Sequence, residues 1–157
     1  MDGLQPPFSG ALGIRMNIFN FFGRKTELID GKLGRIEYDD NSWAFQMSVG
    51  SSLIDVSIDG SKEKPDEFAK QYWLSQKEHI SDLWLKAINF SKKFFEENFE
   101  HHNSLNSNFT LDAISIHKEK SFDKGHLVFW FHYQEDLNGS YYVSFINEEP
   151  NHLHRDN

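Results

Sequence analysis

The chain contains no cysteine among its 157 residues. This absence excludes disulfide bonds, a thiolate nucleophile, and zinc or iron–sulfur sites built from cysteine ligands. A chain that folds without disulfides suits a reducing compartment, so we expect the protein to act in the cytoplasm.

Long apolar runs are also missing, because no stretch approaches the ~20 residues that a membrane-spanning helix needs. Residues 16–22 (MNIFNFF) form a short apolar patch. Such a patch suits either a weak contact with a membrane surface or packing on the protein's own domain. We favour packing on the domain, and we expect no membrane partner.

Catalytic and nucleotide-binding motifs are missing as well. The sequence has no G-x-x-x-x-G-K-[ST] loop, no G-x-G-x-x-G loop and no G-x-S-x-G elbow. The adjacent carboxylates at 39–40, 96–97 and 148–149 point apart on a strand or helix, so they indicate solvated charge rather than an acid/base pair. We therefore expect no catalytic residue and no cofactor.

Histidine is plentiful, with eight in the chain. His126 and His132 share one face of a regular strand, but they stand roughly 20 Å apart along it. His117, on a neighbouring strand, supplies at most a second ligand to either of them. A stable metal site normally needs three or four ligands, so the sequence predicts none.

The net charge is −8, from 16 basic and 24 acidic residues. Such a surface repels phosphate backbones, which argues against a nucleic-acid partner. It favours a basic protein partner by electrostatic steering, although the charge alone is also explained by solubility.

Residue patterning predicts an α+β fold. Period-2 alternation and turn residues indicate strands at 33–38, 43–49, 54–59 and 113–117, and a hairpin at 125–147 around Asn138-Gly139. Apolar residues recur at helical spacing from Pro65 to Glu100, where Ser81 permits one long helix or two shorter ones. We expect a mostly antiparallel sheet of about six strands with this helical segment packed on one face.

One domain accounts for the length of the chain. Residues 1–15 contain three glycines and two prolines, so we expect a flexible leader, with Met1 or Met16 as the natural start. Residues 16–150 then form a single α+β domain, and residues 151–157 form a flexible tail.

Four residues are candidates for partner binding. Asp55 and Asp59 alternate outward on one predicted strand, and with Glu37 they predict an acidic sheet face that receives a basic partner. Trp73 lies near the edge of the helical apolar stripe and is a candidate for an exposed aromatic anchor; the alternative, which we favour, is core packing.

Several segments together resemble a group of small bacterial domains of unknown function with a β-β-β-α-β-β-β layout. They are FFGRK, LGRIEYDDNSWAF, DVSIDG, LDAISIH and HLVFWF. Some proteins of this kind sit beside polymorphic toxins as immunity proteins. The resemblance implies a bacterial protein that neutralises a toxin by occlusion.

Three functions are therefore open. The first is a non-enzymatic protein-binding domain of the immunity type, with a basic toxin as partner. The second is a small enzyme or ligand-binding domain, which requires a cavity between helix and sheet with converging histidines or carboxylates. The third is a structural homo-oligomer with a self-complementary apolar face.

Overall fold

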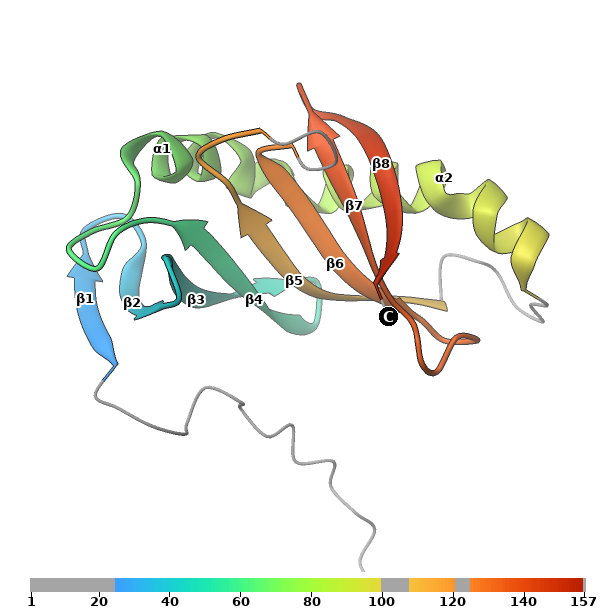
Figure 1. Cartoon of the computed structure of the whole chain (residues 1–157), viewed down its shortest axis with the longest axis horizontal. Helices are drawn as coiled ribbons and strands as arrows, with labels where there is room; N and C mark the ends of the chain where they lie inside the picture. Colours follow the sequence, from blue (N-terminus) through green and yellow to red (C-terminus); the bar gives the residue numbers. More distant parts are fainter. Residues whose placement is uncertain (1–24, 100–107, 121–124, 157) are drawn as a thin grey trace, which may run out of the picture.

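A computed structural model describes residues 25–99, 108–120 and 125–156. The expected leader, the alternative start at Met16 and the apolar patch at 16–22 lie outside these residues. The described part is an eight-stranded sheet with a helical segment on one face (Figure 1). The elements are β1 (Thr26–Asp30), β2 (Gly34–Asp39), β3 (Ser42–Val49), β4 (Ser52–Asp59), α1 (Glu67–Gln76), the 3-10 turn η2 (Lys77–His79), α2 (Ile80–Asn98), β5 (Phe109–Ile116), β6 (Leu127–Tyr133), β7 (Ser140–Ile146) and β8 (Glu149–Asp156).

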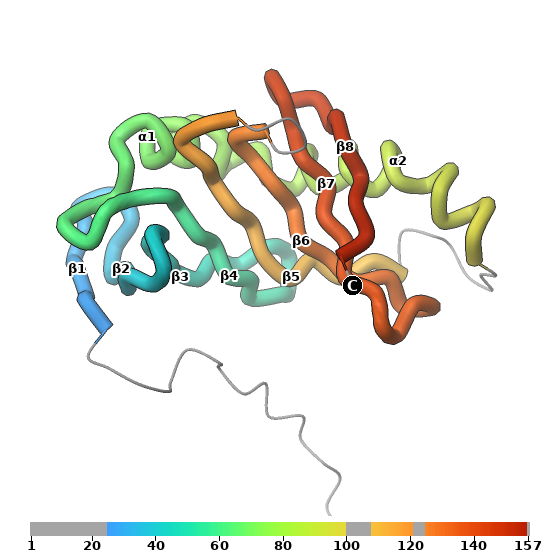
Figure 2. Tube along the Cα trace, in the orientation of Figure 1, coloured from blue at the N-terminus to red at the C-terminus, as the bar shows by residue number. Residues whose placement is uncertain are grey.

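The strands lie in the sheet in sequence order, β1 to β8. All neighbours are antiparallel except β4 and β5, which are parallel. A parallel pair needs a crossover connection, and the helical segment provides it. Figure 2 follows the chain from β1 and β2 at one end of the sheet, through the helices behind it, to the strands from β5 to β8. The predicted α+β class and mostly antiparallel sheet are confirmed.

The predicted number of strands is wrong, because the sheet has eight strands rather than about six. The first extra strand is β1, whose five residues form a hairpin with β2. A strand this short gives little alternation in the sequence, and it forms because β2 offers a backbone edge to pair with.

The second extra strand, β8, corrects the predicted flexible tail. Residues 149–156 pair antiparallel with β7, and Arg155 lies opposite Tyr141. The sequence EPNHLHRD has low strand propensity and contains a proline. Pro150 is tolerated because β8 is an edge strand and the register shifts beside it, between Ser144 and Phe145.

The predicted C-terminal hairpin is confirmed as β6 and β7, but its turn differs from the expectation. The connection runs from residue 134 to 139, so Asn138-Gly139 is the end of a longer loop rather than a two-residue turn. Left-handed pairs occur instead at Asp40-Asn41, between β2 and β3, and at Asn147-Glu148, between β7 and β8. Tight hairpins require such backbone geometry.

The helical segment contains two α-helices joined by a 3-10 turn. Asp66 caps α1, because its side chain accepts a hydrogen bond from the Ala69 N–H at 3.0 Å. The second helix begins at Ile80, close to the break suggested by Ser81. Its buried side chains recur at three- and four-residue spacing, as an amphipathic helix requires. They are Ile80, Leu83, Ala87, Ile88, Ser91 and Phe95.

The core lies between the helices and the sheet face that they cover, here called the inner face. Phe95 of α2 is fully buried, and its ring centroid lies 4.4 Å from that of Tyr133 and 4.9 Å from that of Tyr141. Because the helices pass over β4 to β7, the inner-face side chains of these strands are buried. On β3, Phe45, Met47 and Val49 remain half-buried, so part of the inner face is open there.

Candidate binding surfaces

The three predicted acidic residues share the sheet face opposite the helices, here called the outer face. Residues paired across neighbouring strands point to the same face. Ala44 pairs with Glu37 on one side and with Ser57 on the other. Asp55 and Asp59 flank Ser57 at two-residue spacing, so all three carboxylates lie on this face of β2 and β4.

Two of the three carboxylates have a charged or imidazole neighbour. Glu37 pairs with Lys25 Nζ at 3.3 Å. Asp59 Oδ1 lies 3.3 Å from His117 Nδ1, and Asp59 Oδ2 accepts the Lys118 N–H at 3.0 Å. Burial raises the pKa of Asp59, but these hydrogen bonds outweigh burial and hold the pKa below its usual value. Asp59 therefore carries a negative charge at neutral pH.

Asp55 differs from the other two. Its side chain is exposed, and Oδ1 accepts a hydrogen bond from Gln46 Nε2 at 2.9 Å. No ion pair with Asp55 occurs among the described residues. A solvated carboxylate without a cationic neighbour is available to form an ion pair with a basic group of another molecule.

The outer face is not equally accessible along its length. Val128 and Ser144, on β6 and β7, are fully buried, and Tyr142 is 4% exposed. Gln46 and Ser48 on β3 and Asp55 on β4 are exposed. The accessible acidic surface therefore lies over β2, β3 and β4, and we call it the acidic strip. It is defined by Glu37, Gln46, Asp55 and Asp59.

The prediction that Trp73 is an exposed anchor is wrong. Its side chain is 2% exposed, and its ring contacts Phe45 edge-on at a centroid distance of 5.8 Å. Trp73 belongs to the core, which was the alternative interpretation. In the sequence, Trp73 lies at the edge of the apolar side of the helix, where exposure to solvent is expected. In the structure, β3 extends far enough to cover it.

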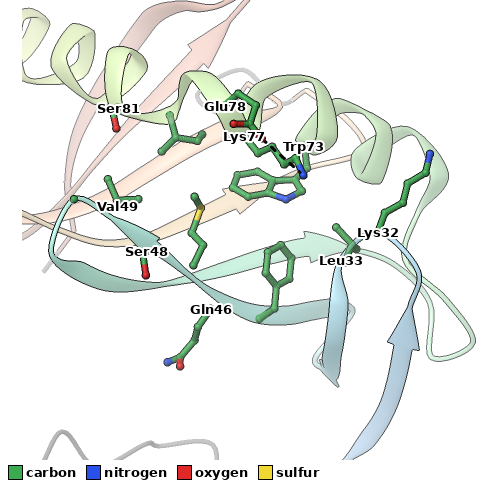
Figure 3. Close-up of a pocket in the computed structure, with 13 residues that line it drawn as sticks. Lys32, Leu33, Gln46, Ser48, Val49, Trp73, Lys77, Glu78 and Ser81 are labelled. Carbon is green, nitrogen blue, oxygen red and sulfur yellow. Dashed lines mark ion pairs between the residues drawn. The ribbon is translucent and has the colours of Figure 1, made fainter.

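A cavity of about 390 Å³ lies where Trp73 meets the half-buried part of β3 (Figure 3). Phe45, Met47 and Val49 line it from β3, and Leu33 closes one side from the β1–β2 turn. Lys77 and Glu78 of η2 also line it, and they form an ion pair at 4.0 Å. The cavity thus combines an apolar floor with charged groups from the turn between the helices.

A second cavity of about 410 Å³ continues along the same side of α2. The two cavities share Val49, Gly50 and Ser81, so together they form one groove between the β3–β4 turn and the helices. The second cavity adds Trp84 and Leu85 from α2. We refer to the combined feature as the helix–strand groove.

The groove does not provide the chemistry that the enzyme hypothesis requires. No histidine is among the described residues that line it, and Glu78 is their one carboxylate. Lys32 and Lys77 are the cations there. The residues of this lining do not form an acid/base pair, but they can bury an apolar side chain of a binding partner.

The described histidines have different partners and do not form a metal site. His117 adjoins His126, as the strand pairing predicted, but the His126 ring packs on Phe68 of α1 while His117 Nδ1 faces Asp59. His132 pairs with Asp112. Within the described ranges, no group of three or more histidine, aspartate or glutamate side chains is placed to hold a metal ion.

Two further features of these surfaces were not among the four candidate binding residues. Trp130 lies on the outer face, where Ala113 separates it from Asp55 in one row across the sheet. The alternation of residues 127–133 (LVFWFHY) already places Trp130 on the face opposite Phe129 and Phe131. No sequence pattern predicts the helix–strand groove, because the groove depends on how far the helices extend over β3.

Comparison of the chain with protein-family models, curated proteins and solved structures finds no match. In the part of the chain that the structure describes, no helix is both long enough and apolar enough to cross a membrane.

Proposed function

We propose that this protein is a non-enzymatic binding domain that docks a basic protein partner on the acidic strip. The observation that carries the proposal is the placement of Glu37, Asp55 and Asp59 on one accessible sheet face, with Asp55 exposed and lacking a cationic partner among the described residues. A net charge of −8 adds long-range attraction for a basic partner.

Binding by this surface is steric and electrostatic. Asp55 is exposed and has no ion pair among the described residues, so it attracts an oppositely charged surface and disfavours acidic partners. The resemblance to immunity-type bacterial proteins makes a basic toxin, met in the cytoplasm, the first partner to test. In that form, the acidic strip covers a functional surface of the toxin without any bond chemistry.

A charge-reversal comparison tests the proposal. Wild type, Asp55→Lys and Glu96→Lys serve as baits in lysate from the source organism, at low and high salt. Both substitutions change the net charge equally, but Glu96 is exposed on α2, away from the acidic strip. Circular dichroism verifies that all three baits are folded.

We expect a partner that the wild type and Glu96→Lys retain at low salt, and that Asp55→Lys loses. High salt weakens the capture because it screens exposed charges. Equal capture by all three baits, or capture that is indifferent to salt, contradicts docking on the acidic strip.

A further inference from the structure

The edge of β3 that faces β2 is only partly paired. Among the described residues, β2 pairs with β3 at Ser42, Trp43 and Ala44, whereas β3 continues to Val49. On its other side, β3 pairs with β4 along its whole length. Residues 46–49 therefore present a strand edge without a described strand beside it. Such an edge offers N–H and C=O groups to any extended chain that can reach it.

The turn of the β1–β2 hairpin is anchored to the helical layer. Asp30 at the end of β1 accepts hydrogen bonds from the Lys32 and Leu33 N–H groups at 2.8 and 2.9 Å. Lys70 of α1 donates to Asp30 Oδ2 at 2.5 Å. The Lys70 contact joins the turn to α1, and Lys32 and Leu33 of this turn line the helix–strand groove opposite β3.

The unpaired edge separates two different surfaces. On the inner side, Met47 and Val49 line the groove. On the outer side, Gln46 and Ser48 are exposed, and Gln46 is bonded to Asp55 of the acidic strip. Because strand side chains alternate, a strand added here directs every second residue into the groove and the others over the acidic strip.

We propose that the edge of β3 at residues 46–49 accepts an extended segment of the protein partner as an additional strand, in which apolar residues alternate with basic ones. This proposal rests on the proposed function and specifies the chemistry of the partner. Main-chain hydrogen bonds supply affinity in this binding mode, and alternate side-chain positions supply specificity.

Charge complementarity fixes which residues face which side. The groove carries Lys32 and Lys77 against one carboxylate, Glu78, and this positive balance disfavours a basic side chain. Its floor of Phe45, Met47 and Val49 favours an apolar side chain. On the acidic strip, Glu37 is paired with Lys25, whereas Asp55 has no ion pair among the described residues and favours a lysine or arginine. An added strand with acidic residues does not match the charge of the acidic strip, and a uniformly apolar strand offers it no basic side chain.

Three capped synthetic peptides test the proposal directly. One alternates isoleucine and lysine, one has the same composition in two blocks, and one alternates isoleucine and glutamate. Binding to the full chain is measured by fluorescence anisotropy, and hydrogen exchange locates the contact. We expect the isoleucine–lysine peptide to bind about tenfold more tightly than either control and to slow amide exchange within residues 46–49.

Groove variants test the inner side. Ser81 lines both cavities from an exposed position on α2, so Ser81→Arg places a large cation in the groove without disturbing the core. Ser75 is exposed on α1 and does not line the groove, so Ser75→Arg is the matched control. We expect Ser81→Arg to weaken the isoleucine–lysine peptide about tenfold and Ser75→Arg to leave it unchanged.

Four results of the peptide measurements overturn the proposal. They are no binding of the isoleucine–lysine peptide, equal binding of the block peptide, equal binding of the glutamate peptide, and insensitivity to Ser81→Arg. A wild-type dimer in light scattering that Ser81→Arg dissociates also overturns it, because a second copy then occupies the edge. If a captured partner is lost with Asp55→Lys but retained with Ser81→Arg, strand addition is wrong while docking on the acidic strip stands.

Discussion

Lys70 Nζ on α1 lies 2.5 Å from Asp30 Oδ2 at the end of β1, and both side chains are largely shielded from water. This ion pair joins the first hairpin to the helical layer. Burial raises the pKa of Asp30, but the hydrogen bonds from Lys70, Lys32 and Leu33 outweigh it and keep the pKa below its usual value. Asp30 is therefore negatively charged at neutral pH, and its contact with Lys70 lies at one end of the sheet.

Replacing Asp30 with alanine leaves the Lys70 ammonium and two backbone N–H groups without their acceptor. We expect a loss of about 1–3 kcal/mol in the free energy of unfolding. The matched control is Arg35→Ala, which breaks an exposed ion pair with Glu27 and should cost much less, because water screens exposed pairs. Urea titration of both variants measures the difference, and equal losses contradict the role given to the Asp30–Lys70 pair.

Gly125 is required because another backbone passes close to it. A Cβ atom at this position falls 1.6 Å from the Phe145 carbonyl oxygen of β7. Gly125→Ala therefore forces β6 and β7 apart, and we expect it to cost about 1–3 kcal/mol. At Gly31, nothing lies within 4 Å of the added atom, so Gly31→Ala serves as the control with little effect. Thermal unfolding of the two variants decides the matter; similar melting temperatures refute the prediction.

Asp136 makes the free energy of unfolding depend on pH. Hydrogen bonds from Arg155, and then from Tyr141, lower the pKa of Asp136 to about 2. Because the folded-state pKa lies below the unfolded value near 4, this contribution is complete above about pH 5 and is lost as the pH falls toward 2. We expect its size to be on the order of 1–2 kcal/mol, since Arg155 is partly exposed and water screens the pair.

Asp136→Asn tests that dependence. The variant is expected to be less stable than wild type at pH 7 and to approach it as the pH falls to about 2, which chemical unfolding at several pH values measures. Glu96→Gln, at an exposed position on α2, should follow the wild-type curve. A constant difference between Asp136→Asn and wild type at every pH shows that the carboxylate charge is not responsible.

Trp73 has its main role in the core. Trp73→Ala removes a large buried ring that contacts Phe45, so we expect a loss of about 3–5 kcal/mol. Phe90 on the same helical segment is 43% exposed, and Phe90→Ala should change stability by less than about 0.5 kcal/mol. Unfolding followed by circular dichroism compares the two. A stable, fully folded Trp73→Ala variant excludes the core assignment.

Residue alternation predicted most of the inner architecture. The runs at 43–49 and 54–59 form β3 and β4 near the expected limits, because each has one apolar face that needs burial. The same logic placed Asp55 and Asp59 on one face of β4. For β1 and β8, pairing with a neighbour matters more than propensity, so local sequence carried little signal for either strand.

The amino-acid sequence alone determined the fold class, the acidic charge, the absence of cysteine chemistry, and the faces of β3 and β4, since these follow from composition and period-2 patterning. Only the tertiary structure decided that Trp73 is buried, that residues 149–156 form a strand, and that β3 has an unpaired edge beside a groove. Those features depend on contacts between residues far apart in the chain, such as Asp30 with Lys70, and on how far the helices extend over the sheet. A local pattern in the sequence does not contain that information.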